Sequence, residues 1–330
     1  MSKLEMRIHL EGGKRDYTGG DLVAGAVYVM AREPVDCRSL TVELLWQAHG
    51  KGNRNVQTID SQVEGEQRWE PGFEQRFPFR FQLPKSPWTY HGHLLNVDYH
   101  LCARADFPWA RDAVVEEEIV VLPGAPPEGE AQAKWDQEGP LSAPKSVRKS
   151  ALASLTGSAV MVLLLLALAF LFTPIFLILV LIVAIRAVRT VISERRLGKV
   201  QVSLEPLRVS PGRSVQAQVW FPKTERVEVR SICATVTGEE ICQSQTGRNR
   251  RTYKHTLHKD VVALEPSGHN EFCGELRLPD TDAYTFKSKD NEIAWQITVH
   301  VDISNWPDWQ RVYPVTVAPQ FSDALDGQSP

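Results

Sequence analysis

The chain has 330 residues, and its 37 Lys and Arg side chains nearly balance its 40 Asp and Glu side chains, giving a net charge of −3. This balance argues against a protein dedicated to nucleic acid, because such proteins carry a large excess of positive charge. The mean hydropathy of −0.24 is typical of a soluble protein. Residues 151–185, however, contain no Lys, Arg, Asp or Glu. We therefore do not expect a freely soluble single-domain enzyme.

Residues 1–122 show the pattern of an antiparallel, immunoglobulin-like β-sandwich. Short apolar or alternating runs recur, and Gly, Pro, Asn and Asp separate them, as at Gly19-Gly20. Such runs with turn residues between them are typical of β-sandwiches. The expected strands are Leu22–Met30, Leu40–Gln47, Phe77–Leu83, Leu95–Ala105 and Val114–Leu122.

The rest of the chain divides into four parts. Residues 123–150 are rich in Pro, Gly and Glu and are expected to form a flexible linker. Residues 151–192 contain the uncharged segment, and residues 193–319 return to the β pattern. Residues 320–330 are polar and are expected to form a flexible tail.

The two β regions repeat one another. At a shift of 192 residues, Gly20 aligns with Gly212 and Arg38-Ser39-Leu40 aligns with Arg230-Ser231-Ile232. After a drift of a few residues, Leu83-Pro84 aligns with Leu278-Pro279. Any two β-sandwiches share the alternation of apolar and polar residues, but this alternation does not explain Arg-Ser and Leu-Pro pairs at matching points in the same order. The repeat therefore predicts a duplicated domain.

Three motifs carry a family resemblance. A glycine turn, Thr18-Gly19-Gly20-Asp21, precedes a strand and recurs as Ser210-Pro211-Gly212-Arg213. A strand of the form Phe79-x-Phe81-x-Leu83-Pro84 is followed by one of the form Tyr99-x-Leu101-x-Ala103. The pattern resembles arrestin-like domains over about 240 residues. The resemblance implies two β-sandwiches that act as a protein-interaction scaffold, with no particular partner indicated.

The uncharged segment predicts a transmembrane helical hairpin. At 1.5 Å per residue, its 35 residues would make a helix of roughly 52 Å, whereas about 30 Å of hydrocarbon needs only about 20 residues. Thr173-Pro174 interrupts the segment near its middle, so we place the turn at 173–174. One kinked helix that spans the membrane once is the alternative.

Basic residues flank both ends of this segment and favour the hairpin. Lys and Arg prefer the cytoplasmic side of a membrane, and a hairpin places both basic clusters there. We therefore expect an integral protein of the inner or cytoplasmic membrane with both β domains in the cytoplasm. Small residues such as Gly157 and Ser158 would allow helices to pack within the hairpin or between two copies of the chain.

The sequence shows no candidate catalytic, cofactor-binding or metal-binding set. The glycine-rich nucleotide loops, the HExxH helix and the GxSxG elbow are all absent. His91, His93 and His100 lie near Asp98 and could in principle hold a metal. We interpret them as residues of a polar face and its loops, and we expect no enzyme activity, cofactor or metal.

Two surface features are candidate interaction sites. The first is a set of basic residues expected to contact lipid headgroups, with a solvated hairpin tip as the alternative for its second half: Arg186, Arg189, Arg195, Arg196, Arg248, Arg250, Arg251 and Lys254. Nucleic acid is not expected to bind there, because aromatic stacking residues are not interleaved with the charge. The second feature is Trp306 with Trp309, which forms either an exposed partner patch or a cap on the edge of the sandwich.

These features together predict a non-catalytic, membrane-anchored scaffold or adaptor. It would present two arrestin-like domains to unidentified protein partners at the cytoplasmic membrane surface, through exposed strands or loops. The alternative is a regulatory or accessory subunit of a membrane transport or envelope-stress assembly.

Overall fold

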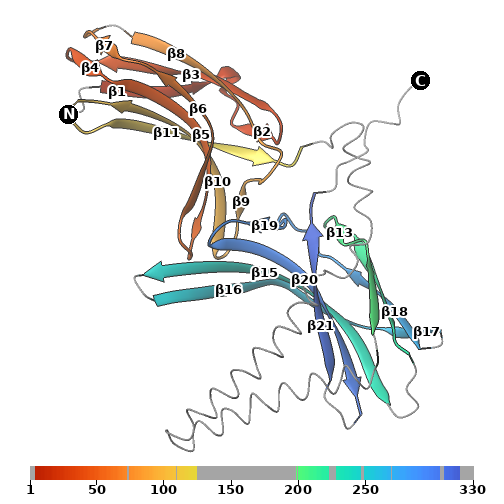
Figure 1. The fold of residues 1–330 in the computed structure, drawn as a ribbon. Coiled ribbons are helices and arrows are strands. Elements are labelled where there is room, and N and C mark those ends of the chain that lie inside the picture. The colour runs from red at the N-terminus through yellow and green to blue at the C-terminus, as the bar shows by residue number, and fades with distance from the viewer. Residues whose placement is uncertain are drawn as a thin grey trace, which may run out of the picture.

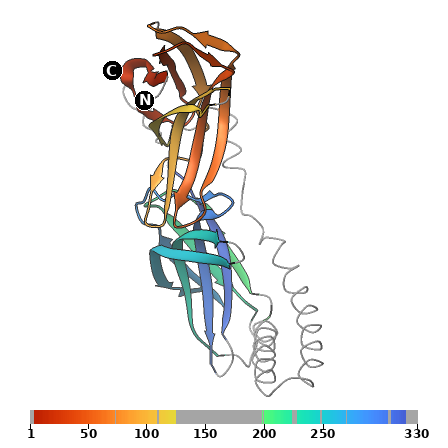
Figure 2. The ribbon, with the colours of Figure 1, turned by 90° about the vertical axis from the view of Figure 1, so that its left-hand side faces the viewer.

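The computed structural model describes residues 4–72, 74–108, 110–124, 198, 200–222, 228–246, 249–268, 270–304 and 308–319. The described residues form two β domains, which lie end to end and give the molecule an elongated shape (Figure 2).

The first domain is a sandwich of two sheets, with a small additional pair of strands, β4 (Val35–Cys37) and β7 (Gln67–Trp69). A 3-10 helix, η1, covers Glu11–Gly13. One sheet has the order β1 (Leu4–Leu10), β3 (Leu22–Ala31) and β8 (Glu74–Gln82). The larger sheet, with β9 (Tyr90–His91) added to β10, has the order β2 (Asp16–Thr18), β11 (Ala113–Leu122), β10 (Leu95–Asp106), β5 (Ser39–Gly50) and β6 (Asn55–Glu64) (Figure 1).

The second domain is built in the same way. Its smaller sheet has the order β12 (Gln201–Glu205), β14 (Ser214–Trp220), β18 (Glu271–Arg277) and β17 (Glu265–Gly268). Its larger sheet, with β19 (Phe286–Lys287) added to β20, has the order β13 (Arg208–Val209), β21 (Trp309–Val317), β20 (Asn291–Ile303), β15 (Val229–Thr246) and β16 (Asn249–Ala263).

The repeat seen in the sequence is present in the strand order and in individual hydrogen bonds. In the first domain the Thr89 hydroxyl accepts a hydrogen bond from Val121 N at 2.9 Å. In the second domain, 196 residues further on, the Thr285 hydroxyl accepts one from Val317 N at 2.8 Å. Both larger sheets also close with a parallel pair, β2 with β11 and β13 with β21. A duplicated domain predicts this agreement.

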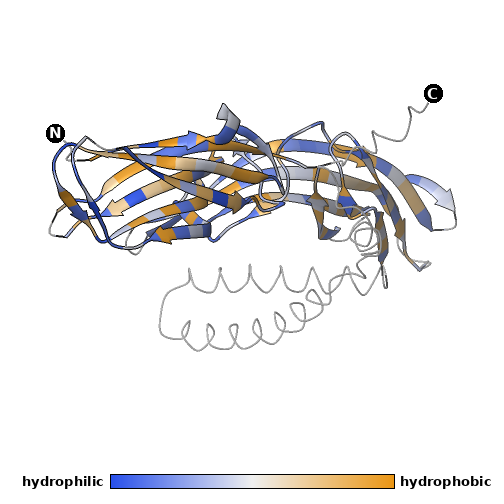
Figure 3. Ribbon diagram, turned by 90° about the horizontal axis from the view of Figure 1, so that it is seen from above, coloured by the Kyte–Doolittle hydropathy of each residue, from blue (hydrophilic) through white to orange (hydrophobic). Residues whose placement is uncertain are grey.

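Alternating side chains build both cores. Along β20 every second residue is buried, from Asn291 to Ile303, and β5 shows the same alternation from Leu40 to Ala48. Successive side chains of a strand point to opposite faces, so each large sheet buries one apolar face against its smaller partner sheet. Figure 3 shows the resulting alternation of hydrophobic and hydrophilic residues along the strands.

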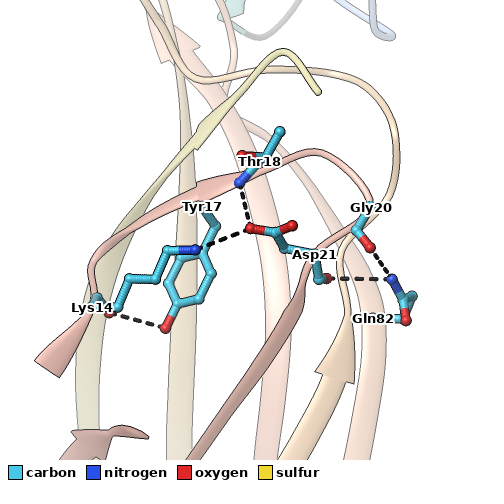
Figure 4. A network of polar contacts seen from close by, with 6 residues as sticks. All are labelled: Lys14, Tyr17, Thr18, Gly20, Asp21 and Gln82. Atoms are coloured by element: carbon cyan, nitrogen blue, oxygen red, sulfur yellow. Dashed lines mark hydrogen bonds and ion pairs between the residues drawn. The ribbon is translucent and has the colours of Figure 1, made fainter. Parts of the chain in front are cut away.

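The glycine turn that the repeat shares has a structural cause. Gly20 and Gly212 both have positive φ, at 94° and 72°, a conformation that favours glycine. In the first domain, Asp21 completes the turn by accepting hydrogen bonds from Thr18 N at 3.0 Å and Lys14 Nζ at 3.1 Å (Figure 4). Gln82 donates to the Gly20 carbonyl, which ties β8 to this turn.

The structure corrects the membrane part of the sequence interpretation. The segment 151–192 lies outside the described residues, and so do most of the linker at 125–150 and the tail at 320–330. Across the residues that are described, no helix has the length and apolar character needed to span a bilayer. The predicted transmembrane hairpin, and the membrane localisation inferred from it, are therefore wrong for the described structure, which consists of strands and the short η1.

Candidate functional site at the domain interface

The two domains meet through their larger sheets. From the first domain come the hairpin between β5 and β6 and the loop between β9 and β10. From the second domain come the middle of β15 and the hairpin between β19 and β20. Figure 1 shows β9 and β10 descending onto the second domain at this point. The buried residues of both domains form one continuous hydrophobic cluster across the contact.

A fully buried carboxylate lies at the centre of this interface. Glu240 on β15 is 0% exposed, and both of its carboxylate oxygens accept hydrogen bonds from the first domain. Its Oε1 accepts from the Tyr90 hydroxyl at 2.6 Å and from His93 N at 3.1 Å, and its Oε2 accepts from Leu94 N at 2.7 Å. Three hydrogen bonds offset part of the desolvation of this carboxylate. Glu240 therefore joins the β9–β10 loop to the second domain.

Two asparagines of the β5–β6 hairpin form a second polar contact. Asn55 Oδ1 accepts from Asp290 N and from the Ser288 hydroxyl, both at 2.9 Å. The Asn53 carbonyl accepts from Asn291 Nδ2 at 2.8 Å. The Asn55 side chain and the Asn53 carbonyl thereby hydrogen-bond the β5–β6 hairpin to the second domain's β19–β20 hairpin.

Aromatic side chains surround a cavity beside these contacts. Trp88 packs edge-on against Tyr284 with ring centroids 5.0 Å apart, and Trp46 packs against Phe286 at 5.7 Å. Trp88 and Tyr284 are equivalent positions of the two copies, 196 residues apart, so the contact has approximate two-fold symmetry. The cavity has a volume of about 440 Å³, and its lining includes Trp46, Trp88, Tyr90, Tyr284 and Phe286.

Burial at the interface changes the acidity of two side chains. Desolvation raises the pKa of the Tyr90 hydroxyl far above its ordinary value, and the hydrogen bond to Glu240 raises it further. Desolvation, together with the nearby Glu240, raises the pKa of the Cys242 thiol to about 11. Both groups therefore stay protonated near neutral pH. The Tyr90 hydroxyl acts as a hydrogen-bond donor, and Cys242 is a packed thiol close to the Leu94 carbonyl, at 3.5 Å.

This arrangement is suited to holding two domains in one orientation. The Tyr90 hydroxyl and the His93 and Leu94 amides all donate to Glu240. If the domains separated, these three donors and the carboxylate would each have to find water as a new hydrogen-bond partner. Gly92 permits the close approach, because a Cβ at this position would collide with Glu240 Oε1 and with the Tyr90 ring. The site therefore functions as a joint with defined geometry.

Of the predicted basic residues that the structure describes, Lys254 lies on β16 next to His255 of the joint, and Arg250 and Arg251 lie further along the same strand. Arg250 and Arg251 are exposed on β16, and Lys254 forms an ion pair with Glu239 at 3.0 Å. The other predicted basic residues, Arg186, Arg189, Arg195, Arg196 and Arg248, lie outside the described residues.

The structure places Trp309 in the core. It is only 4% exposed, on the inward face of β21, and Arg311 lies over its ring at 5.5 Å. Trp309 thus packs inside the second sandwich. Trp306 lies outside the described residues.

The histidines separate into two groups. His93 belongs to the interface, where its ring stacks on His255 with centroids 3.9 Å apart. His91 lies on the outer face of the sheet beside Asp98, and His100 is hydrogen-bonded to Gln47 at 2.6 Å.

Sequence reasoning missed Glu240 and the two asparagines. A signal for Glu240 was present, because it occupies the inward phase of β15, in step with the buried Val236 and Cys242. A charged residue in the buried phase of a strand indicates a partner. Asn53 and Asn55 gave no such signal, since asparagine is common in hairpin turns.

No protein-family model matches the chain, and no curated protein matches its sequence. Among solved structures, the chain is similar to the crystal structure of Spo0M, sporulation control protein, from Bacillus subtilis. The identity is 14%, the match covers 78% of this chain and 91% of that chain, and the TM-score is 0.33.

Proposed function

We propose that the protein is a non-catalytic adaptor built from two arrestin-like β-sandwich domains. The observation that supports this most is the interface around Glu240, which joins the domains through a buried carboxylate and paired aromatic side chains. A joint of this kind fixes the relative position of two sets of edge strands and loops. An adaptor needs such a fixed arrangement to present its binding surfaces together.

The adaptor would recruit its partner along the edge strand β16. This strand has 15 residues and lies at the end of its sheet, so within the described residues one side of it has no neighbouring strand. Val261 on β16 is 55% exposed. An exposed edge with free backbone groups accepts an additional strand from another protein, as in β-augmentation.

The charge of β16 indicates the chemistry of that partner. The strand contains four basic side chains, Arg250, Arg251, Lys254 and Lys259, and a single acidic one, Asp260. Three of the basic residues lie within five positions at one end. An extended segment rich in Asp and Glu would complement this edge and would be attracted to it over several ångströms.

Peptide display against the purified full chain tests this function. Ten-residue peptides from a random library would be selected for binding, first to the wild type and then to the double variant Arg250→Glu/Arg251→Glu. We expect acidic peptides to be enriched by the wild type and to lose at least tenfold in affinity for the double variant. Gln57→Glu/Gln62→Glu on the equivalent strand β6 is the matched control and is expected to bind as the wild type does.

Hydrogen exchange distinguishes strand addition from simple charge attraction. A bound acidic peptide should slow exchange of the β16 amides that have no partner in the free protein. The proposal is overturned if the selected peptides are not acidic, if the double variant binds them equally, or if β16 stays unprotected. It is also overturned if anionic phosphatidylserine vesicles bind through Arg250 and Arg251 while no peptide does.

A further inference from the structure

Four potential metal ligands meet on the outer face of the first domain's larger sheet. Each comes from a different strand: His49 from β5, His91 from β9, Asp98 from β10 and Glu118 from β11. In the ladder, Asn96 pairs with both His49 and His91, and His100 pairs with Glu118. Asp98 lies between Asn96 and His100 on the same face, so the other three side chains are its diagonal neighbours.

Asp98 is the fixed point of this cluster. It is 7% exposed, and both of its carboxylate oxygens contact imidazoles. His91 Nε2 lies 2.6 Å from Oδ1, and His49 Nε2 is hydrogen-bonded to Oδ2. The ligand atoms of His91, Asp98 and Glu118 all lie within 4.8 Å of one another. Glu118 is exposed, and it forms no ion pair in the part of the chain that the structure describes.

We propose that this cluster is a binding site for a divalent transition-metal ion of the zinc class. His91 Nε2, an oxygen of Asp98 and an oxygen of Glu118 are the ligands, and water completes the shell. One imidazole with two carboxylates suits Zn²⁺, whose ligands lie about 2.0–2.2 Å from the metal. His49 is a positioning residue, because it holds the second oxygen of Asp98 and so orients the first.

The geometry requires only a small adjustment. Two ligands of a tetrahedral zinc ion are separated by about 3.3 Å, so His91 must move away from its present position at 2.6 Å from Asp98. The His91 side chain is 60% exposed and has room to do so. The metal would replace the proton that His91 Nε2 shares with Asp98, leaving the ring proton on Nδ1.

The second domain shows that the fold itself does not require this cluster. Its equivalent positions, identified by the same ladder pairs, hold Ile241, Lys287, Ala294 and Pro314. All four potential ligands are absent there, although the strands are the same. The cluster is thus a specific property of the first copy.

Calorimetric titration of the full chain with Zn²⁺, after chelator treatment and removal of any affinity tag, tests the proposal. We expect one Zn²⁺ per chain with a dissociation constant in the micromolar range or below. His91→Gln and Glu118→Gln should each weaken binding at least tenfold, and His49→Gln should also weaken it. The matched control is His300→Gln, which breaks the other His–Asp pair of the sheets, His300 with Asp308 at 3.2 Å.

The titration can either support or overturn the proposed zinc site. His91 and Glu118 are exposed, so their variants should keep the wild-type circular dichroism spectrum and melting temperature. Loss of Zn²⁺ binding in folded variants, with His300→Gln unchanged, supports the site. The proposal is overturned if the wild type binds no Zn²⁺ below 100 μM (about −5.5 kcal/mol), or if the His91 and Glu118 variants bind it as the wild type does.

Discussion

The edge strands β6 and β16 occupy the same place in the two copies but have opposite charge. β6 contains two acidic residues and no basic ones, whereas β16 contains four basic residues and one acidic one. The two larger sheets, by contrast, share one strand order, and the same threonine hydrogen bond recurs in both domains. The two copies therefore share a strand order but differ at their edge strands and at the buried position of Glu240, and these differences indicate where each copy acts.

The largest expected loss of stability comes from removing the buried carboxylate of Glu240, which has no counterpart in the first domain. Glu240 corresponds to Ala48 in the first domain. Glu240→Ala would leave the Tyr90 hydroxyl and two amides without acceptors, at a cost of about 4 kcal/mol. We expect a lower melting temperature, and small-angle scattering should show a wider range of domain orientations.

Glu239→Ala is the control for that variant. The Glu239 side chain pairs with Lys254, whose side chain is 56% exposed, and such a pair contributes about 0.5 kcal/mol. If Glu240→Ala melts and scatters as Glu239→Ala does, the interface does not hold the domains together.

Cysteine reactivity provides a second comparison, between the interface and the outer surface. Cys242 is fully buried with a pKa of about 11. At pH 8 this shift from an ordinary value lowers its thiolate fraction about 100-fold. We expect iodoacetamide to modify the half-buried Cys273 well before Cys242, as followed by mass spectrometry.

The same measurement reports on the joint when it is opened. In Glu240→Ala, Cys242 should become reactive because the Leu94 backbone no longer covers it. Equal rates for Cys242 and Cys273 in the wild type would contradict the described interface.

A smaller effect on stability is expected at a loop that each domain holds with a side-chain hydrogen bond, from a tyrosine in one domain and a tryptophan in the other. The Tyr99 hydroxyl donates to the Pro87 carbonyl at 2.7 Å, and at the equivalent place Trp295 Nε1 donates to the Ala283 carbonyl at 2.8 Å. Tyr99→Phe should lower the free energy of unfolding by about 1 kcal/mol. Urea denaturation measures this, with the half-buried Tyr28→Phe as control, and equal effects of the two variants would contradict it.

The smallest effect is expected at the glycine turn, where Asp21 has Arg213 as its counterpart. The hydrogen bond from Thr18 N is the main reason that the pKa of Asp21 lies below its usual 3.8, and Lys14 adds to it. A lowered pKa stabilises the fold above the unfolded-state pKa, and this contribution disappears as the pH falls through the folded-state value.

Asp21→Asn should therefore destabilise the protein by about 0.5 kcal/mol near neutral pH, since the side chain is partly exposed to solvent. The difference from the wild type should shrink as the pH falls through the folded-state pKa of Asp21, which lies below its usual 3.8, and be smallest at the lowest pH at which the protein stays folded. A difference that persists unchanged at that pH would show that the carboxylate charge is not its cause.

Features set by neighbouring residues could be predicted from the sequence. The turn at Gly20 and Gly212 requires positive φ, and the alternation along β5 and β20 marks the buried faces, so the repeat and the β pattern were visible. Trp309 could also have been placed inside, because it shares its phase on β21 with the buried Tyr313 and Val315.

Features that depend on distant residues could not be predicted. Glu240 meets Tyr90 across 150 positions, and the approach depends on the missing side chain of Gly92. Near Asp98 the sequence showed His91, but only the ladder brings Glu118 beside it. Nearness along the chain therefore placed His91 close to Asp98, whereas the position of Glu118 follows only from the sheet pairing of β10 with β11.

The parallel pairs β2–β11 and β13–β21 have an evolutionary consequence. In each copy, the pair joins a strand near the start of the domain to its last strand, so each sandwich is closed before the chain leaves it. Each domain therefore completes its own sheets and can be duplicated or recombined as a unit. The interface between the domains needs residues from both of them, so those residues must evolve together.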